Sequence, residues 1–256
     1  SELLDEVVVV GYGTMKRKDL TGAVAAVKGD DLAARKTTQL STALQGAASG
    51  VLVTRDNSAP GSTASIKIRG VTTIGESSPL VIVDGVPGDI NQVNPEDVES
   101  MSVLKDAASA SIYGSRAAAG VIVITTKRAK ENDLSLNYNF EYGWEMPTKL
   151  PEYVGTQRFM EMVNELRYND NNAGGWYQTY SEDQVNNWIK NNATDPDAYP
   201  VTDWQDEILK NSAPRQTHSI NIAGGSKVVR TKASFRYDKK DGIYVIRNYE
   251  RYMIRV

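Results

Sequence analysis

The C-terminal half of the chain alternates apolar and polar residues with a period of two. Over residues 134–142, Leu, Tyr or Phe occupies every second position, and Ser, Asn or Glu lies between. The same alternation returns around Ile220, around Phe235 and around Tyr252. Because successive side chains of a β-strand point to opposite faces, these segments predict four strands with one apolar and one polar face.

The connections between these strands differ greatly in length. Residues 223–227 (AGGSK) predict a tight hairpin turn, whereas the connection over about residues 145–215 is long and rich in Asn, Asp, Tyr and Trp. Its clearest regular element is a predicted helix at 156–168. One short and one long connection indicate two different ends of the sheet.

Two architectures fit a sheet with one apolar face. In a soluble sandwich the apolar face forms the core, whereas in a transmembrane β-barrel it meets lipid and the polar face lines the lumen. Aromatic residues gather at the strand ends, as in the interfacial girdle of a barrel; they are Tyr138, Phe140, Tyr142, Trp144, Phe235, Tyr237, Tyr249 and Tyr252. These rings favour the barrel.

The N-terminal half has a different composition, rich in Val, Ala, Gly, Ser and Thr up to about Lys130. It predicts short strands bounded by Gly, Pro, Asn or Asp at 23–28, 51–55, 65–69, 80–83, 99–104 and 120–126. Helices are predicted at 38–47 and at 107–113, the second ending at Gly114 as a C-terminal cap. The sequence therefore predicts a compact α+β domain.

Composition narrows the possible functions. The chain has 256 residues, of which 40% are hydrophobic and 24% charged, as in globular proteins. A net charge of −3 gives no reason to expect a nucleic-acid partner. With no cysteine and one histidine, His218, the chain cannot form disulfides, thiolate zinc sites or histidine-clustered metal sites, and we expect neither metal nor cofactor.

Signals for catalysis are weak. The segment 7–13 (VVVVGYG) looks like a strand entering a phosphate loop, but the third glycine of that motif would fall at Lys16. Carboxylates are frequent at Asp84, Asp89, Glu96, Asp97 and Glu99, without a neighbouring nucleophile or base. Such residues usually cap turns and helices. We therefore expect that the protein is not an enzyme.

Several motifs in combination resemble one family. They are residues 5–14 (DEVVVVGYGT), 65–70 (SIKIRG), 79–87 (PLVIVDGVP), 103–127 (VLKDAASASIYGSRAAAGVIVITTK) and 249–252 (YERY). Together they resemble the SusC/RagA type of TonB-dependent outer-membrane transporters, the glycan or peptide importers of Bacteroidetes. The resemblance covers almost the whole chain and is weakest over 145–215.

The resemblance implies an organisation for the chain. Residues 1–18 would be a Ton box and tether, 19–128 a plug domain, and 129–256 the first strands of a barrel of about 22 strands. The connection 145–215 would be an extracellular loop, and 223–227 a periplasmic turn. The chain is then expected to be the N-terminal piece of a longer protein that lies in the outer membrane, with lipid around the barrel and the plug in its lumen.

The resemblance also implies residues that contact TonB, namely Asp5, Glu6, Val7, Val8, Val9 and Val10. β-Branched residues favour an extended chain, and an unpaired strand can add to the edge of a partner's sheet. We therefore expect 7–10 to lack a hydrogen-bond partner within its own chain. The alternative is an ordinary first strand of the plug sheet.

Three aromatic residues in the long connection are candidates for binding. Trp176, Tyr177 and Tyr180 would contact a solute, either a glycan or a peptide, or the SusD-like lipoprotein that partners this family. A second hypothesis is a secreted or periplasmic carbohydrate-binding β-protein in which the same rings stack on sugars. The sequence leaves the identity of the solute open.

Overall fold

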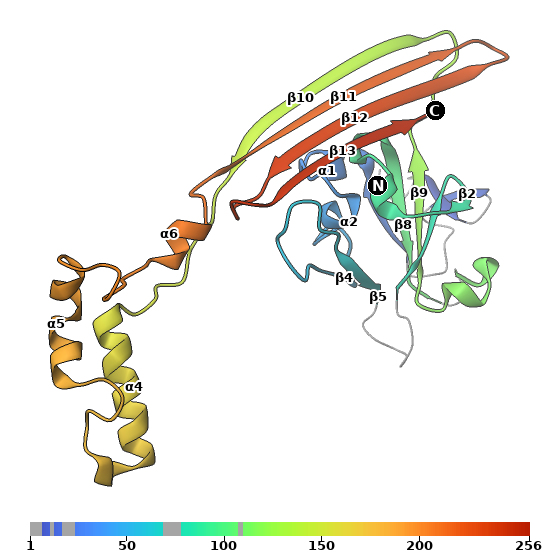
Figure 1. Cartoon of the computed structure of the whole chain (residues 1–256). Helices are drawn as coiled ribbons and strands as arrows, with labels where there is room; N and C mark the ends of the chain where they lie inside the picture. The colour runs from blue at the N-terminus through green and yellow to red at the C-terminus, as the bar shows by residue number, and fades with distance from the viewer. Residues whose placement is uncertain (1–6, 11–12, 17–23, 69–77, 107–109) are drawn as a thin grey trace. The chain divides into compact units, whose positions relative to one another are not determined.

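The structure is a computed structural model that describes residues 7–10, 13–16, 24–68, 78–106 and 110–256 (Figure 1). The chain forms two compact units, one made of residues 1–145, 213–242 and 246–256, and the other of residues 146–212 and 243–245. Within the first unit, a mixed α/β domain precedes a sheet of four long strands, β10–β13. We call these parts the N-terminal domain and the long sheet.

Short strands build the N-terminal domain; the sequence predicts all of the following except β7. They are β3 (Val24–Lys28), β4 (Val51–Thr54), β5 (Ser65–Ile68), β6 (Leu80–Val83), β7 (Val86–Pro87), β8 (Val98–Leu104) and β9 (Val121–Thr126). Five of them form one sheet in the order β3-β8-β9-β6-β7, in which β6 and β9 are parallel and the other neighbours antiparallel. Strands β4 and β5 form a separate antiparallel pair.

The helices of this domain are shorter than the sequence predicts. Helix α1 (Gly29–Ala33) was not expected, and α2 (Leu40–Ala43) is only the middle of the predicted helix 38–47. Gly46, with φ of 67°, turns the chain soon after α2 ends. The remaining helical turns are of the 3₁₀ type: η3 (Ile90–Gln92), η4 (Pro95–Asp97), η5 (Ser111–Tyr113) and η6 (Ser115–Ala117).

The predicted helix at 107–113 begins outside the described residues, which resume at Ala110. Ala110 is α-helical, and its amide donates to the Asp106 carbonyl over 3.0 Å. Residues 111–113 form the 3₁₀ turn η5, so the α-helix ends earlier than predicted. Gly114 follows with φ of 75°, the left-handed conformation expected of a glycine that terminates a helical turn.

Apolar side chains of the two helices pack against the central strands of the sheet. Leu32, Leu40 and Leu44 are fully buried in one cluster with Met101 and Ile122. Their burial fixes the loop 36–39, which lies between α1 and α2, relative to β8 and β9. That loop and the turn η4 carry the contacts described in the next subsection.

The long sheet confirms the predicted period of two. Its strands are β10 (Leu134–Glu145), β11 (Ala213–Gly225), β12 (Arg230–Asp241) and β13 (Asn248–Arg255), and each pairs antiparallel with the next (Figure 1). A hairpin turn joins β11 to β12, but it occupies 226–229 and not 223–227, because residues 223–225 still belong to β11. In this turn the Ser226 amide donates to the Val229 carbonyl over 2.7 Å.

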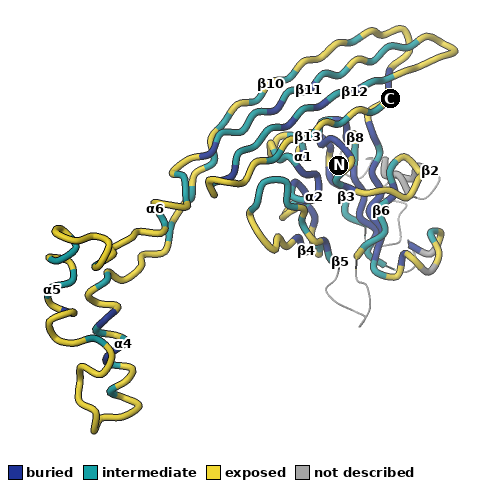
Figure 2. Tube along the Cα trace, viewed as in Figure 1, coloured by how far each residue is buried: buried dark blue, intermediate teal, exposed yellow. Residues whose placement is uncertain are grey.

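The two faces of the long sheet have opposite environments. Exposed and buried positions both occur along the strands of the long sheet (Figure 2). Apolar side chains on one face are open, with Leu134 82% and Ile254 77% exposed, whereas Thr217, Ser219 and Asp238 on the other face are fully buried. No described residues form a second sheet over the apolar face. Among the described helices, none is both long and apolar enough to cross a membrane.

The second unit consists of helices α4 (Thr156–Asp170), α5 (Glu182–Asn192) and α6 (Trp204–Ile208), with the 3₁₀ turn η7 (Asn172–Gly174). Helix α4 confirms the prediction at 156–168. Helix α5 begins with a capping box in which Ser181 and Gln184 bond each other's backbone. The buried Asn164 accepts the Thr179 and Tyr180 amides over 3.1 and 2.9 Å and joins α4 to the segment before α5.

At the start of the described chain, β1 (Val7–Val10) pairs antiparallel with β2 (Gly13–Lys16), with Val7 opposite Lys16. The expectation that 7–10 has no partner in its own chain is therefore wrong, because a hairpin supplies one. The two strands form a sheet of their own, so β1 is not a strand of the five-stranded sheet either.

Candidate functional site

The polar face of the long sheet contacts the N-terminal domain. Among the described residues, three short segments of the domain carry these hydrogen bonds and ion pairs: the loop 36–39, the turn at Asp84 and the turn 94–97. We call these contacts the domain–sheet interface. They are the most concentrated set of buried polar groups in the first unit.

The turn 94–97 (Asn-Pro-Glu-Asp) is formed by its own sequence. The Asn94 side chain accepts a hydrogen bond from the Glu96 amide over 3.1 Å and so caps the 3₁₀ turn, and Pro95 takes the first position, where no amide donor is needed. The Lys127 amide donates to the Asp97 carbonyl over 2.8 Å, which fixes the end of the turn beside β9.

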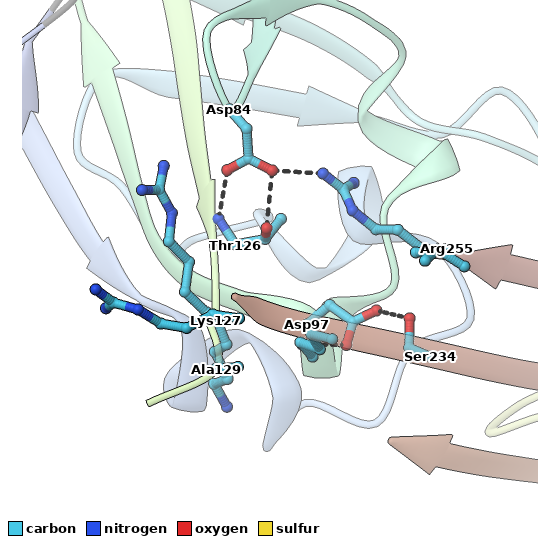
Figure 3. A pocket seen from close by; sticks show the side chains of 11 residues that line it. Asp84, Asp97, Thr126, Lys127, Ala129, Ser234 and Arg255 are labelled. Carbon is cyan, nitrogen blue, oxygen red and sulfur yellow. Dashed lines mark hydrogen bonds and ion pairs between the residues drawn. The ribbon is translucent and has the colours of Figure 1, made fainter. Parts of the chain in front are cut away.

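Both acids of this turn bond the long sheet. Asp97 is 1% exposed, and its carboxylate accepts from Lys232 Nζ over 2.7 Å and from Ser234 Oγ over 2.6 Å, both on β12 (Figure 3). Glu96 accepts from Asn139 on β10 and from Ser219 on β11. One four-residue turn thus bonds three successive strands.

Arg236 on β12 is buried in a fully hydrogen-bonded position. Its Nε donates to both oxygens of Asp238 over 2.9 and 3.0 Å, and Asp238 also accepts from Thr217 Oγ1 over 2.8 Å. The other guanidinium nitrogens donate to Asn94 Oδ1 over 3.0 Å and to the Thr37 carbonyl over 3.3 Å. The charge of Arg236 is therefore balanced within the sheet, and only neutral oxygens of the domain meet it.

The loop 36–39 supplies the second set of contacts. Lys36 Nζ lies 2.6 Å from Glu141 Oε1 on β10, and Arg215 donates to the Lys36 carbonyl. Lys36 has φ of 53°, an uncommon conformation for a residue with a side chain. Gln39, 5% exposed, accepts from Arg251 on β13 over 2.7 Å.

Asp84 supplies the third set of contacts. It occupies an Asp-Gly turn between β6 and β7 with φ of 49°, followed by Gly85 at 90°, the dihedral pattern of a tight hairpin turn. Its carboxylate accepts from the Thr126 amide over 2.9 Å, from Thr126 Oγ1 over 2.8 Å and from Arg255 on β13 (Figure 3). A cavity of about 460 Å³ lies between Asp84, Asp97 and the sheet residues Arg230 and Arg255.

Charge is distributed asymmetrically across the interface. At the turns 84 and 94–97 the domain offers the carboxylates of Asp84 and Asp97, and β12 and β13 offer Lys232 and Arg255. Complementary charges fix the register of two surfaces. No cluster of three His, Cys, Asp or Glu suited to a metal occurs among the described residues. Chemically, the arrangement holds two surfaces together through polar groups that water can replace.

The sequence-predicted binding residues lie elsewhere. Asp5 and Glu6 lie outside the described residues, and Val7–Val10 is strand β1. Trp176 and Tyr177 belong to the second unit, where they are 40% and 44% exposed, and the Trp176 ring centre lies 5.4 Å from that of Tyr168. Tyr180 bonds Asn164 through its backbone.

Sequence reasoning missed the interface acids. From the sequence, Asp84, Glu96 and Asp97 are interpreted as caps of turns or helices. Asp89 does act as such a cap, because its carboxylate accepts a hydrogen bond from the Asn91 amide over 2.8 Å. The available signal was the pairing of an acidic turn with the polar positions of the alternating strands, because a face lined by Ser, Lys and Arg needs polar partners when it is covered.

Comparisons with known proteins agree on one family. The family model described as TonB-dependent Receptor Plug Domain matches residues 16–121. The TonB-dependent receptor SusC of Bacteroides thetaiotaomicron is 34% identical over 268 residues, covering 100% of this chain and 24% of that protein. The TonB-dependent receptor P39 of Formosa agariphila is 50% identical over 129 residues, covering 50% of this chain and 12% of the relative.

A solved structure extends the likeness to the long sheet. The RagAB peptide importer in its 'open-open' state superposes with a TM-score of 0.75 at 31% identity, over 96% of this chain and 29% of that one. The chain thus spans about a quarter of the length of the relatives it matches. It belongs to the SusC/RagA type of TonB-dependent receptors, which are outer-membrane β-barrel proteins, and contains their plug domain and the first antiparallel strands of the barrel.

Proposed function

We propose that the full-length receptor imports a bulky solute across the bacterial outer membrane, with the plug closing the barrel until TonB displaces it. The observation that carries this proposal is the domain–sheet interface. The strands present apolar side chains outward and bond the plug through their polar face. An interface of hydrogen bonds and ion pairs can exchange its partners for water when the plug moves, which a close-packed apolar core cannot do at comparable cost.

Energy for this movement has to come from outside the outer membrane, which has neither ATP nor a useful ion gradient. We propose that TonB delivers it mechanically by binding residues 5–10. Strand β1 pairs with β2 on one edge, and no described strand pairs with its other edge. A TonB strand can add there through main-chain hydrogen bonds, or it can replace β2.

The solute is proposed to be an oligosaccharide or a peptide. The similarity to the RagAB peptide importer supports a peptide. The resemblance of the sequence to SusC/RagA-type importers supports an oligosaccharide as the alternative. Trp176 and Tyr177, each about half exposed in the second unit, are the proposed contacts for the solute or for a SusD-like lipoprotein. Import is a transport step, so no catalytic residue is assigned.

The test measures solute accumulation by cells that make the full-length receptor, with and without TonB. Val8→Pro removes one backbone donor from β1 and is expected to reduce uptake to the level of cells lacking TonB, while solute still binds at the surface. Val8→Thr retains the donor and the β-branch, and is expected to transport normally. Full uptake by the Val8→Pro variant would refute the TonB site, and uptake that does not need TonB at all would refute the transport mechanism.

A further inference from the structure

We propose that the ion pair between Asp97 and Lys232 is the latch that sets the force needed to move the plug off the barrel wall. This inference rests on the proposed function, because a latch matters only if the plug moves. The neighbouring pair of Arg236 and Asp238, although buried more deeply, is a fixed dock that resists this movement less.

Three ion pairs cross the interface among the described residues: Lys36 with Glu141, Asp84 with Arg255, and Asp97 with Lys232. The first two each include a side chain that is well exposed, at 49% for Lys36 and 38% for Arg255. In the third, the Asp97 side chain is 1% and the Lys232 side chain 18% exposed. Exposed pairs contribute little, because water and salt screen them.

Burial turns this pair into a barrier against displacement. Coulomb attraction falls inversely with distance, and Nζ and Oδ1 are 2.7 Å apart at rest, so a displacement of a few ångströms removes more than half of it. Water has to reach the carboxylate before Asp97 regains its hydration, because its side chain is only 1% exposed while the pair is closed. The plug therefore passes through a state in which Asp97 is neither paired nor hydrated, which is costly for a buried charge.

The dock behaves differently because both of its charges belong to β12. Arg236 and Asp238 remain bonded to each other wherever the plug goes, and Asp238 retains Thr217 as well. Only the bonds from Arg236 to Asn94 and Thr37 break, and both acceptors are neutral. Departure of the plug thus leaves no unpaired charge at the dock, so the barrier is concentrated at Asp97.

The test is single-molecule pulling on the full-length receptor in supported membrane vesicles, with the load applied through a handle at the N-terminal end of the chain. Asp97→Asn keeps the shape and the acceptor for Ser234 but removes the charge. We expect it to raise the rate of plug release roughly 30-fold, and Lys232→Gln to have a similar effect. The double variant is expected to release no faster than either single variant, because both remove the same interaction.

Asp30→Asn is the matched control. Asp30 forms an ion pair with Lys127 over 3.0 Å, but both residues belong to the plug, so its release rate is expected to equal that of the wild type. The exchange of charges in Asp97→Lys with Lys232→Asp is a second variant that is expected to restore slow release. An unchanged release rate in Asp97→Asn, or effects of the two single changes that add independently, would overturn the latch. Pulling needs neither solute nor TonB, so its outcome is separate from that of the uptake test.

Discussion

Replacing Arg236 is the most severe test of the claim that buried, paired charges stabilise the domain–sheet interface. Its guanidinium donates to both oxygens of Asp238, to Asn94 and to the Thr37 carbonyl, and it is 4% exposed. Arg236→Gln leaves Asp238, which is fully buried, with the hydroxyl of Thr217 as its remaining partner. Breaking a buried pair from one side costs about 3–5 kcal/mol, because an uncompensated charge stays behind. We expect a loss of that size in the free energy of unfolding.

The assay is urea unfolding of the full-length receptor in detergent micelles, followed by tryptophan fluorescence. The double variant Arg236→Gln with Asp238→Asn is expected to be more stable than Arg236→Gln alone, since it buries no charge. Lys239→Gln on the same strand removes an exposed pair with Glu250, 3.6 Å apart, and is expected to cost less than about 1 kcal/mol. A loss below 1 kcal/mol for Arg236→Gln, or a double variant less stable than the single one, would refute the reasoning.

Three further changes test other parts of the structure. Tyr138→Arg on the apolar face is expected to cost about 2–4 kcal/mol in refolding into lipid vesicles if it lies near the midplane, and Asn139→Lys on the polar face much less; equal costs would contradict the assignment of faces. Gly120→Ala is expected to destabilise the plug by about 1–3 kcal/mol in thermal unfolding. Gly120 has φ of 95°, and a Cβ there would lie 2.8 Å from a neighbouring side chain. Wild-type stability of this variant would count against the described packing. Trp176→Ala with Tyr177→Ala is expected to weaken binding of solute or lipoprotein by about 1–3 kcal/mol, and unchanged affinity for both would return this segment to a structural role.

The sequence was most informative where the period of its side chains was strict. The strands β10 to β13 and the six predicted strands of the N-terminal domain agree with the structure, because alternation and flanking turn residues are local signals. The short helices were less predictable. Helix α1 has five residues, too few to display a helical period, and its position depends on Gly29, where a Cβ would lie 1.8 Å from the Val98 carbonyl oxygen.

Local sequence patterns could not predict the domain–sheet interface, because its partners are far apart in the sequence. Asp97 and Ser234 are 137 positions apart in sequence, and nothing in the neighbourhood of either residue indicates the other. The hairpin of β1 and β2 was missed because a run of four valines predicts an extended segment without saying which strand pairs with it. In both cases the missing information is the partner and not the type of element.

The central claim is that the plug must move relative to the barrel wall for solute to pass, and a reversible tether tests it most directly. Glu96 on the plug bonds Asn139 on β10, and these 256 residues contain no cysteine of their own. Cysteines placed at the two positions, in a receptor whose other cysteines are replaced, can be joined by a short cleavable cross-linker. A matched pair at Lys239 and Glu250 joins two strands of the barrel to each other and leaves the plug untethered.

The measurement is solute uptake by cells making the full-length receptor, before cross-linking, after it and after cleavage of the linker. We predict that uptake falls to background when the plug is tethered, returns on cleavage, and is unaffected by the matched pair, while solute binding at the surface persists throughout. Full uptake by a receptor whose plug is completely cross-linked to β10 would contradict the account.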